Sequence, residues 1–204
     1  MRKRILDSFT LGLLLCLGFP ALTAEETSFA GDIQEFADGA VQRLELEGLP
    51  KAGQTDFKVT FPKSWRAMES RRPGVVTRIS SNGGRGPESL VVWVKQIYEK
   101  AQPVSEEDWS DFIRRFTLPN AKMLEKKRIK EAGFNGTKLV YDIRERRGPF
   151  TLDATITNYV FFQNGAMVQL QFGVKHGETG RETKQRREAY EPLVAEFMKR
   201  VEVE

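Results

Sequence analysis

Residues 137–174 read TKLVYDIRERRGPFTLDATITNYVFFQNGAMVQLQFGV. Turn residues separate three apolar runs in this stretch, Thr137–Arg144, Phe150–Gln163 and Ala166–Val174. Asn164-Gly165, between the second and third runs, is a strong hairpin signal because both residues tolerate the positive φ of a type I′ turn. The stretch therefore predicts a three-stranded antiparallel meander, which the rest of the chain covers.

From Val168 to Phe172 the third run alternates strictly between apolar and polar side chains. An alternation with a period of two residues is typical of a strand with one buried and one solvated face. The buried face is expected to carry Val168, Leu170, Phe172 and Val174, and the solvated face Gln169 and Gln171.

The N-terminal segment has the pattern of a signal peptide. Basic residues from Arg2 to Arg4 precede the apolar run Leu11–Phe19, and Pro20–Ala24 resembles the approach to a cleavage site. The apolar run is too short to span a bilayer, which takes about 20 residues. We therefore predict a signal peptide over residues 1–24 and a periplasmic or secreted protein. A buried helix or an uncleaved anchor is the alternative.

Composition limits the classes of function. The single cysteine, Cys16, lies in the predicted signal peptide, so the processed chain would have no thiol, disulfide or lipid anchor. Processing also removes three basic residues and one acidic residue, which lowers the formal net charge from +4 to +2. This weak positive balance does not indicate nucleic-acid binding.

The processed chain divides into two parts by pattern. Apolar residues spaced three to five positions apart from Glu25 to Leu49 predict an amphipathic helix, and Gly48–Gln54 has the composition of a linker. We therefore expect an N-terminal helix and linker over residues 25–54, either docked or loosely attached. Residues 55–204 are expected to form the α+β domain.

Four further strands are predicted by hydrophobic pattern. Asp56–Pro62 and Val75–Ile79 are short strands, and Trp65 is expected to cover the end of the first. Leu90–Tyr98 is apolar on both faces, which suits the middle of a covered sheet. Met123–Ile129 is rich in charge and is expected at a sheet edge.

Two helices are predicted beside these strands. Ser105 is an N-cap, and the acidic residues after it favour the positive end of a helix dipole rather than a catalytic or metal site. The apolar face of this helix would consist of Trp109, Phe112, Ile113 and Phe116. The closing helix, Thr183–Val201, would be kinked at Pro192 and would bury Tyr190, Leu193, Val194, Phe197 and Val201.

This order of elements resembles the PsbP-like superfamily, which includes bacterial exported DcrB-like and photosystem II extrinsic PsbP-like proteins. The resemblance covers about Phe57–Val201, and the residues that carry it are Phe57–Trp65, Gly133–Tyr141, Asn164-Gly165 and Glu196-Phe197. It implies an α+β fold, with a central antiparallel sheet of six to seven strands and helices on both faces, an αβα sandwich. It also implies a protein that binds or assembles other proteins and catalyses nothing.

The residues give little support for catalysis. His176 is the only histidine, which excludes a two-histidine metal motif within one chain. Gly83–Gly86 lacks the Gly-Lys-Ser/Thr ending of a phosphate-binding loop. No catalytic residue, metal ligand or cofactor is therefore expected. A carboxylate pair for hydrolysis remains open, because the separation of the two groups in space decides that chemistry.

Arginines are the candidate binding residues. Guanidinium groups bind carboxylates and phosphates through paired hydrogen bonds, so a convergent patch would suit an acidic partner or anionic headgroups. Glutamates interleave with these arginines, and a solvated surface of mixed charge is the alternative. The candidates are Arg71, Arg72, Arg144, Arg146, Arg147, Arg181, Arg186 and Arg187.

The leading hypothesis is an exported, non-catalytic binding or assembly-assisting module for an acidic protein partner in the cell envelope. One alternative is a hydrolase that depends on carboxylates alone. Another is a peripheral protein that makes weak contact with an anionic membrane surface, where each cation contributes about 1 kcal/mol. A nucleic-acid partner is not expected, because no stacking aromatic residues interleave with the arginines.

Overall fold

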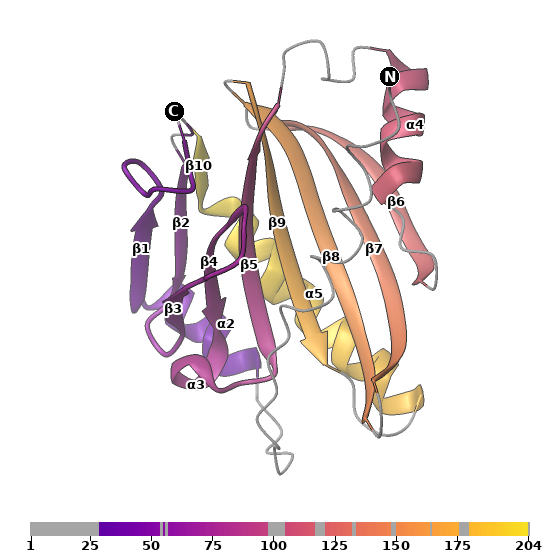
Figure 1. Ribbon diagram of the computed structural model, residues 1–204. Coiled ribbons are helices and arrows are strands. Elements are labelled where there is room, and N and C mark those ends of the chain that lie inside the picture. Colours follow the sequence, from indigo (N-terminus) through magenta and orange to yellow (C-terminus); the bar gives the residue numbers. More distant parts are fainter. Residues whose placement is uncertain are drawn as a thin grey trace.

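The computed structural model describes residues 29–53, 55, 57–97, 105–116, 121–131, 134–147, 150–163, 165–175 and 180–203. The helices in these ranges are α2 (Phe29–Ala37), α3 (Ser81–Gly84), α4 (Glu106–Phe116) and α5 (Gly180–Lys199), shown in Figure 1. The strands are β1 (Val41–Glu45), β2 (Phe57–Pro62), β3 (Arg66–Glu69), β4 (Val75–Ser80), β5 (Glu88–Gln96), β6 (Ala121–Glu131), β7 (Phe134–Arg147), β8 (Phe150–Gln163), β9 (Ala166–Lys175) and β10 (Val201–Val203).

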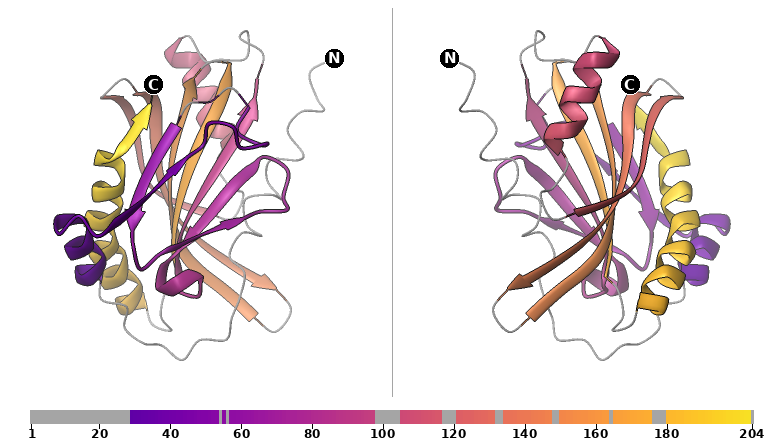
Figure 2. Two further views of the ribbon diagram at one scale, coloured as in Figure 1. Left: turned by 90° about the vertical axis from the view of Figure 1, so that its left-hand side faces the viewer. Right: turned by 90° about the vertical axis from the view of Figure 1, so that its right-hand side faces the viewer.

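The main sheet has seven strands in the order β3-β4-β5-β9-β8-β7-β6, and all neighbouring pairs are antiparallel. Helix α4 covers one face, and α2 and α5 lie on the other (Figure 2). This arrangement confirms the predicted α+β class and the sheet of six to seven strands with helices on both faces.

The predicted meander is confirmed as β7, β8 and β9. Residues Gly136 to Arg147 of β7 pair with Phe150 to Phe161 of β8, and the β8–β9 pairing extends to Gln163 and Ala166. Strand β5 lies beside β9 and is covered on both faces, as its apolar residues predicted. Strand β6 is confirmed at the sheet edge.

The prediction that Gln169 and Gln171 face solvent is wrong. Their exposed fractions are only 1% and 6%. Gln169 donates a 2.9 Å hydrogen bond to Oδ1 of Asn158, and Asn158 donates in turn to the hydroxyl of Tyr141. These polar side chains lie on the sheet face on which α4 packs through Ile113, so hydrogen bonds between side chains replace those to water.

Helix α4 begins as predicted. The Ser105 hydroxyl accepts a 3.0 Å hydrogen bond from the Asp108 amide, and the Asp108 carboxylate accepts one of 3.0 Å from the Ser105 amide. This reciprocal pair is a capping box, so Asp108 belongs to the helix start. Trp109 and Ile113 are buried beneath the helix, and the Arg128 guanidinium of β6 stacks 3.5 Å from the Trp109 ring.

The predicted helix over Glu25–Leu49 is wrong beyond Ala37. Gly39 has a φ of 70°, a left-handed conformation that glycine adopts readily at the end of a helix. The chain then forms β1, which pairs with β2 in a second, three-stranded sheet of order β1-β2-β10. The C-terminal strand β10 also differs from the prediction, because Val201 was expected to continue the closing helix.

The larger core lies between the main sheet and the layer formed by α5, α2 and the small sheet. Phe197 of α5 is at its centre, with ring centroids 5.2 Å from Trp65 and 5.4 Å from Phe172. Phe57, Val59 and Phe61 of β2 are buried here, in keeping with the alternation of apolar residues along this strand. Helix α5 is therefore anchored over the middle of the sheet.

Candidate functional site

A groove runs along α5, between this helix and the outer strands of the main sheet. It consists of two adjoining hollows of about 410 and 230 Å³, both lined by Glu125, Lys138, Tyr159 and Ala195. We call it the α5 groove. It forms because α5 packs over the middle strands of the sheet through Leu193 and Phe197, and β6 and β7 extend beyond the helix.

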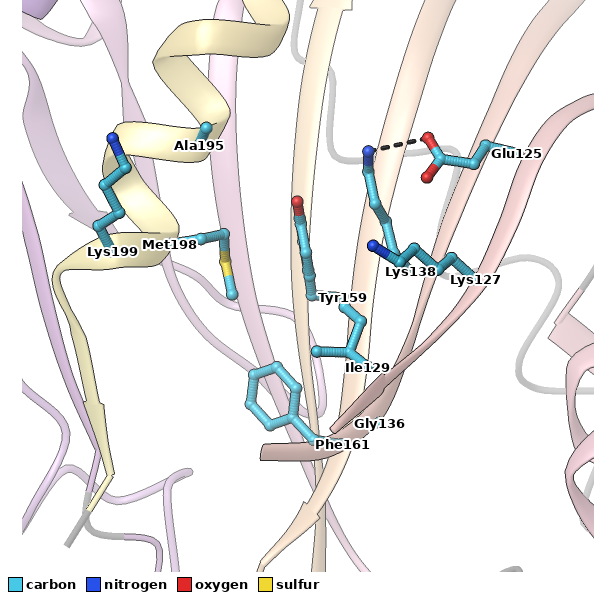
Figure 3. A pocket seen from close by; sticks show the side chains of 10 residues that line it. All are labelled: Glu125, Lys127, Ile129, Gly136, Lys138, Tyr159, Phe161, Ala195, Met198 and Lys199. Carbon is cyan, nitrogen blue, oxygen red and sulfur yellow. Dashed lines mark hydrogen bonds and ion pairs between the residues drawn. The ribbon is translucent and has the colours of Figure 1, made fainter. Parts of the chain in front are cut away.

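The α5 groove changes character along its length, and Figure 3 shows the side chains that line the hollow of about 410 Å³. Its apolar end lies near Gly136, where β6, β8 and α5 bring together Ile129, Phe161 and Met198. Its polar end has charged and hydroxyl side chains, namely Glu125, Lys138, Thr155, Thr157, Arg187 and Glu191. Each strand contributes alternate residues to the groove, because residues two positions apart face the same side of a sheet.

Lys138 is the central charge of the groove. Its ammonium lies 2.8 Å from Glu125 of β6 and 3.3 Å from Glu191 of α5, so it links both sides. Burial alone would lower the pKa of Lys138, but the hydrogen bond to Glu125, with Tyr159 and Glu191 nearby, raises it above its ordinary value. Lys138 therefore stays a cation across the physiological range.

Of the predicted binding arginines, two on α5 make ion pairs within the protein. Arg186 pairs with the buried Glu88 of β5 at 2.9 Å. Arg187 pairs with Asp142 of β7 at 3.3 Å and lines the polar end of the groove. These pairs fix the first half of α5 against the sheet.

The other predicted arginines are more widely distributed. Arg144 on β7 is 79% exposed and lies 3.9 Å from Asp153 of the adjacent strand. Arg71 and Arg72 lie in the connection between β3 and β4, at the other end of the sheet order. The side chains of Arg146, Arg147 and Arg181 lie outside the described part of the structure, as does His176.

The α5 groove was not predicted from the sequence. Its signal was present in Glu125, Lys127 and Ile129, which alternate along the charged edge strand and all line the groove. Which of the two sheet faces they occupy depends on the position of α5, and a local pattern does not give that position.

Among the residues that the structure describes, no group of three or more His, Cys, Asp or Glu side chains is placed to hold a metal ion. Within the same ranges, no helix combines the length and apolar character needed to cross a bilayer.

Comparison with known proteins gives matches in structure alone. No family model matches the chain, and no curated protein is similar in sequence. The cyanobacterial PsbP (CyanoP) of Synechocystis sp. PCC 6803 is 15% identical with a TM-score of 0.57, over 91% of this chain and 100% of that one. The Ran-binding protein Mog1p of Saccharomyces cerevisiae is 12% identical with a TM-score of 0.51, over 80% and 95%.

A third solved structure, LpqN of Mycobacterium tuberculosis, is 16% identical with a TM-score of 0.46, over 82% of this chain and 94% of that one. At these identities the likeness concerns the path of the chain and not the residues of a site. The match to CyanoP covers 91% of this chain, so it concerns the fold as a whole. The chain has the PsbP-like fold that its sequence resemblance implied.

Proposed function

We propose that this protein is a non-catalytic binding module that holds a protein partner of the cell envelope in the α5 groove. The observation that supports this most directly is the groove itself, a hollow with an apolar end and a charged end built on a helix and a sheet. Preformed hollows that combine apolar side chains with polar groups at fixed positions are typical of binding sites.

The arrangement of acids in the groove favours binding over hydrolysis. Glu125 and Glu191 are the two carboxylates that a hydrolase would use here. A glycosidase needs the scissile bond, and often a water, between its two carboxyl groups. In this groove the Lys138 ammonium occupies that place and pairs with both acids.

The predicted arginines would extend the binding surface. Arg187 belongs to the polar end of the groove, and Arg144 is exposed farther along β7. Guanidinium groups at these positions suit an acidic partner. Mog1p, which shares the fold, is described as Ran-binding and so takes a protein ligand.

We also propose that the protein acts after export. The basic and apolar pattern of residues 1–24 supports this, and N-terminal sequencing of the protein purified from its own cells tests it. The expected mature terminus is Glu25. An N-terminus at Met1 in protein from the cytoplasm would contradict export without affecting the binding proposal.

The main test is photo-cross-linking in the cells that make the protein. The photoreactive residue p-benzoylphenylalanine replaces Ala195, which lines the groove, or Ala30, an equally exposed alanine on α2 that serves as the matched control. A discrete protein adduct at position 195 and none at position 30 is the expected result. No adduct specific to position 195, or adducts with lipid alone, would overturn the proposal.

A second experiment decides between binding and hydrolysis. The purified chain is assayed on a panel of glycoside, ester and peptide substrates beside Glu125→Gln and Glu191→Gln. We expect the same background turnover from all three proteins. A robust activity that both variants lose while they remain folded would replace the binding proposal with the hydrolase.

A further inference from the structure

The charge and shape of the α5 groove restrict what its occupant can be. Resting on the proposed function, we infer that the partner enters the groove as a short extended segment with a bulky apolar side chain and nearby carboxylates. The apolar side chain binds between Phe161 and Met198, and the carboxylates bind near Lys127 and Lys138.

The length of the groove fits such a segment. Its helical side runs from Arg187 to Lys199 of α5. At a rise of 1.5 Å per residue, this part of the helix is about 18 Å long. An extended chain covers the same distance in about five or six residues, at about 3.3 Å per residue.

The apolar end supplies the anchor site. Ile129, Phe161 and Met198 come from three elements and face one hollow of about 410 Å³. The flexible thioether of Met198 adapts to side chains of different shape. Aromatic or large aliphatic anchors in such pockets contribute much of the affinity at protein interfaces.

The lysines select for acidic residues beside that anchor. Lys127 is exposed on the sheet side of the groove, and Lys138 is next to it on the adjacent strand, close to Tyr159 (Figure 3). Lys199 and Arg187 on the helix side pair with Glu196 and Asp142, and Lys138 pairs with Glu125 and Glu191. Among the described side chains that line the groove, Lys127 is the exposed cation without an ion pair inside the protein, so it complements a carboxylate of the partner.

The polar end favours a peptide over an acyl lipid. Beyond Tyr159, the groove continues past Thr155, Thr157, Glu125 and Glu191, which include both hydrogen-bond donors and acceptors. An acyl chain there would cover Lys138 and its partners Glu125 and Glu191 with hydrocarbon, and removing these charges from water costs free energy. A peptide has an N–H and a C=O at nearly every residue and can satisfy both kinds.

The test is a selection from a displayed library of random ten-residue peptides on the full chain, with two charge-reversed variants. Lys127→Glu changes a groove residue. Lys126→Glu makes the same change at the neighbouring exposed position, whose side chain points to the other face of the sheet, and serves as the matched control. The expected consensus combines a bulky apolar residue with Asp or Glu within three positions.

Binding of one selected peptide is then measured by fluorescence anisotropy at low salt. Lys127→Glu should weaken it about fivefold and Lys126→Glu by less than about twofold, as expected for an exposed charge pair. Replacing the peptide's acidic residue by Lys should restore binding to Lys127→Glu.

The possible results distinguish a failure of this inference from a failure of the proposed function. A consensus without acidic residues, or equal effects of the two lysine variants, would overturn the inference and leave the proposed function intact. No enriched peptide together with a protein adduct at position 195 would also overturn it, in favour of a folded partner surface. An acyl lipid that co-purifies with the chain and blocks the adduct would overturn both.

Discussion

The guanidinium of Arg186 on α5 donates a 2.9 Å hydrogen bond to Oε1 of Glu88, whose side chain has no exposed surface. The other carboxylate oxygen of Glu88 accepts a 2.6 Å hydrogen bond from the Ser81 hydroxyl. The first contact joins α5 to the start of β5, which is 98 residues away in sequence, and the second joins α3 to the same carboxylate. The ion pair therefore fixes the first half of the helix on the sheet.

Replacing Arg186 by Met should destabilise the protein by about 3 kcal/mol, because the carboxylate of Glu88 would stay buried without this cation. Urea unfolding followed by circular dichroism measures the loss. Arg144→Met, at a side chain that is 79% exposed, is the matched control and should change stability by less than about 0.5 kcal/mol. Equal stability of the two variants would contradict the assignment of a structural role to Arg186.

Arg186 and Arg144 show why the sequence alone does not identify the residues of the binding site. Both belong to charged clusters, and side-chain identity gives the charge but not the partner. Arg186 pairs with a residue 98 positions away, so its role depends on how α5 crosses the sheet. The groove depends on the same crossing. The binding residues predicted from the sequence therefore include Arg187, which lines the α5 groove. The prediction omitted Lys127, Lys138 and Met198, which also line it.

More of the fold than of the binding site could be predicted from the sequence. The Asn-Gly turn, the alternation in β9 and the Ser105 cap are local signals, and each led to the element that the structure contains. Strand β10 has only three residues, and it pairs with β2 across most of the chain length. Such short strands are stabilised by tertiary pairing, so a local pattern does not indicate them.

A glycine on β7 tests the close packing beneath the groove. A methyl group on Gly136 would collide with the Val160 carbonyl oxygen and lie 3.1 Å from Cβ of Phe161. Gly136→Ala should therefore cost about 1–3 kcal/mol, as overpacking does in a rigid core. The change in the free energy of unfolding is measured by chemical denaturation.

Gly31→Ala is the matched control for this prediction. A methyl group there would meet nothing within 4 Å, and the residue lies inside α2. Alanine should stabilise the helix by about 0.5–1 kcal/mol. A Gly136→Ala variant as stable as Gly31→Ala would show that β7 and β8 are packed less closely than the structure describes.

Tyr141, Asn158 and Gln169 are buried and joined by hydrogen bonds, so loss of the Tyr141 hydroxyl should lower the stability of the fold. Tyr141→Phe removes the group to which the Asn158 amide donates and leaves that amide buried. We expect a loss of about 1–2 kcal/mol in the free energy of unfolding, the cost of a buried donor without its acceptor. An unchanged melting temperature would mean that Asn158 finds another acceptor. Burial also raises the pKa of Tyr141, so its phenol should not ionise while the fold persists.

The last turn of α5 gives a prediction about pH. Glu196 accepts hydrogen bonds from Lys199 and from Arg200, and these bonds hold the pKa of Glu196 below its usual value. Arg200 also stacks 4.7 Å from the Phe36 ring, so the same cation joins α5 to α2.

A group whose pKa is lower in the folded state adds stability above its ordinary pKa, and this contribution is lost as the pH falls through the folded value. Glu196→Gln should therefore cost about 0.5 kcal/mol at neutral pH, as helical ion pairs do, and nothing in acid below the folded pKa. Urea unfolding of both proteins across this range measures the difference. Glu69→Gln, at an exposed acid of β3, is the matched control for the loss of a surface carboxylate. If the cost of Glu196→Gln persists unchanged in acid, the carboxylate contributes through packing, and the ion pairs with Lys199 and Arg200 do not stabilise the end of the helix.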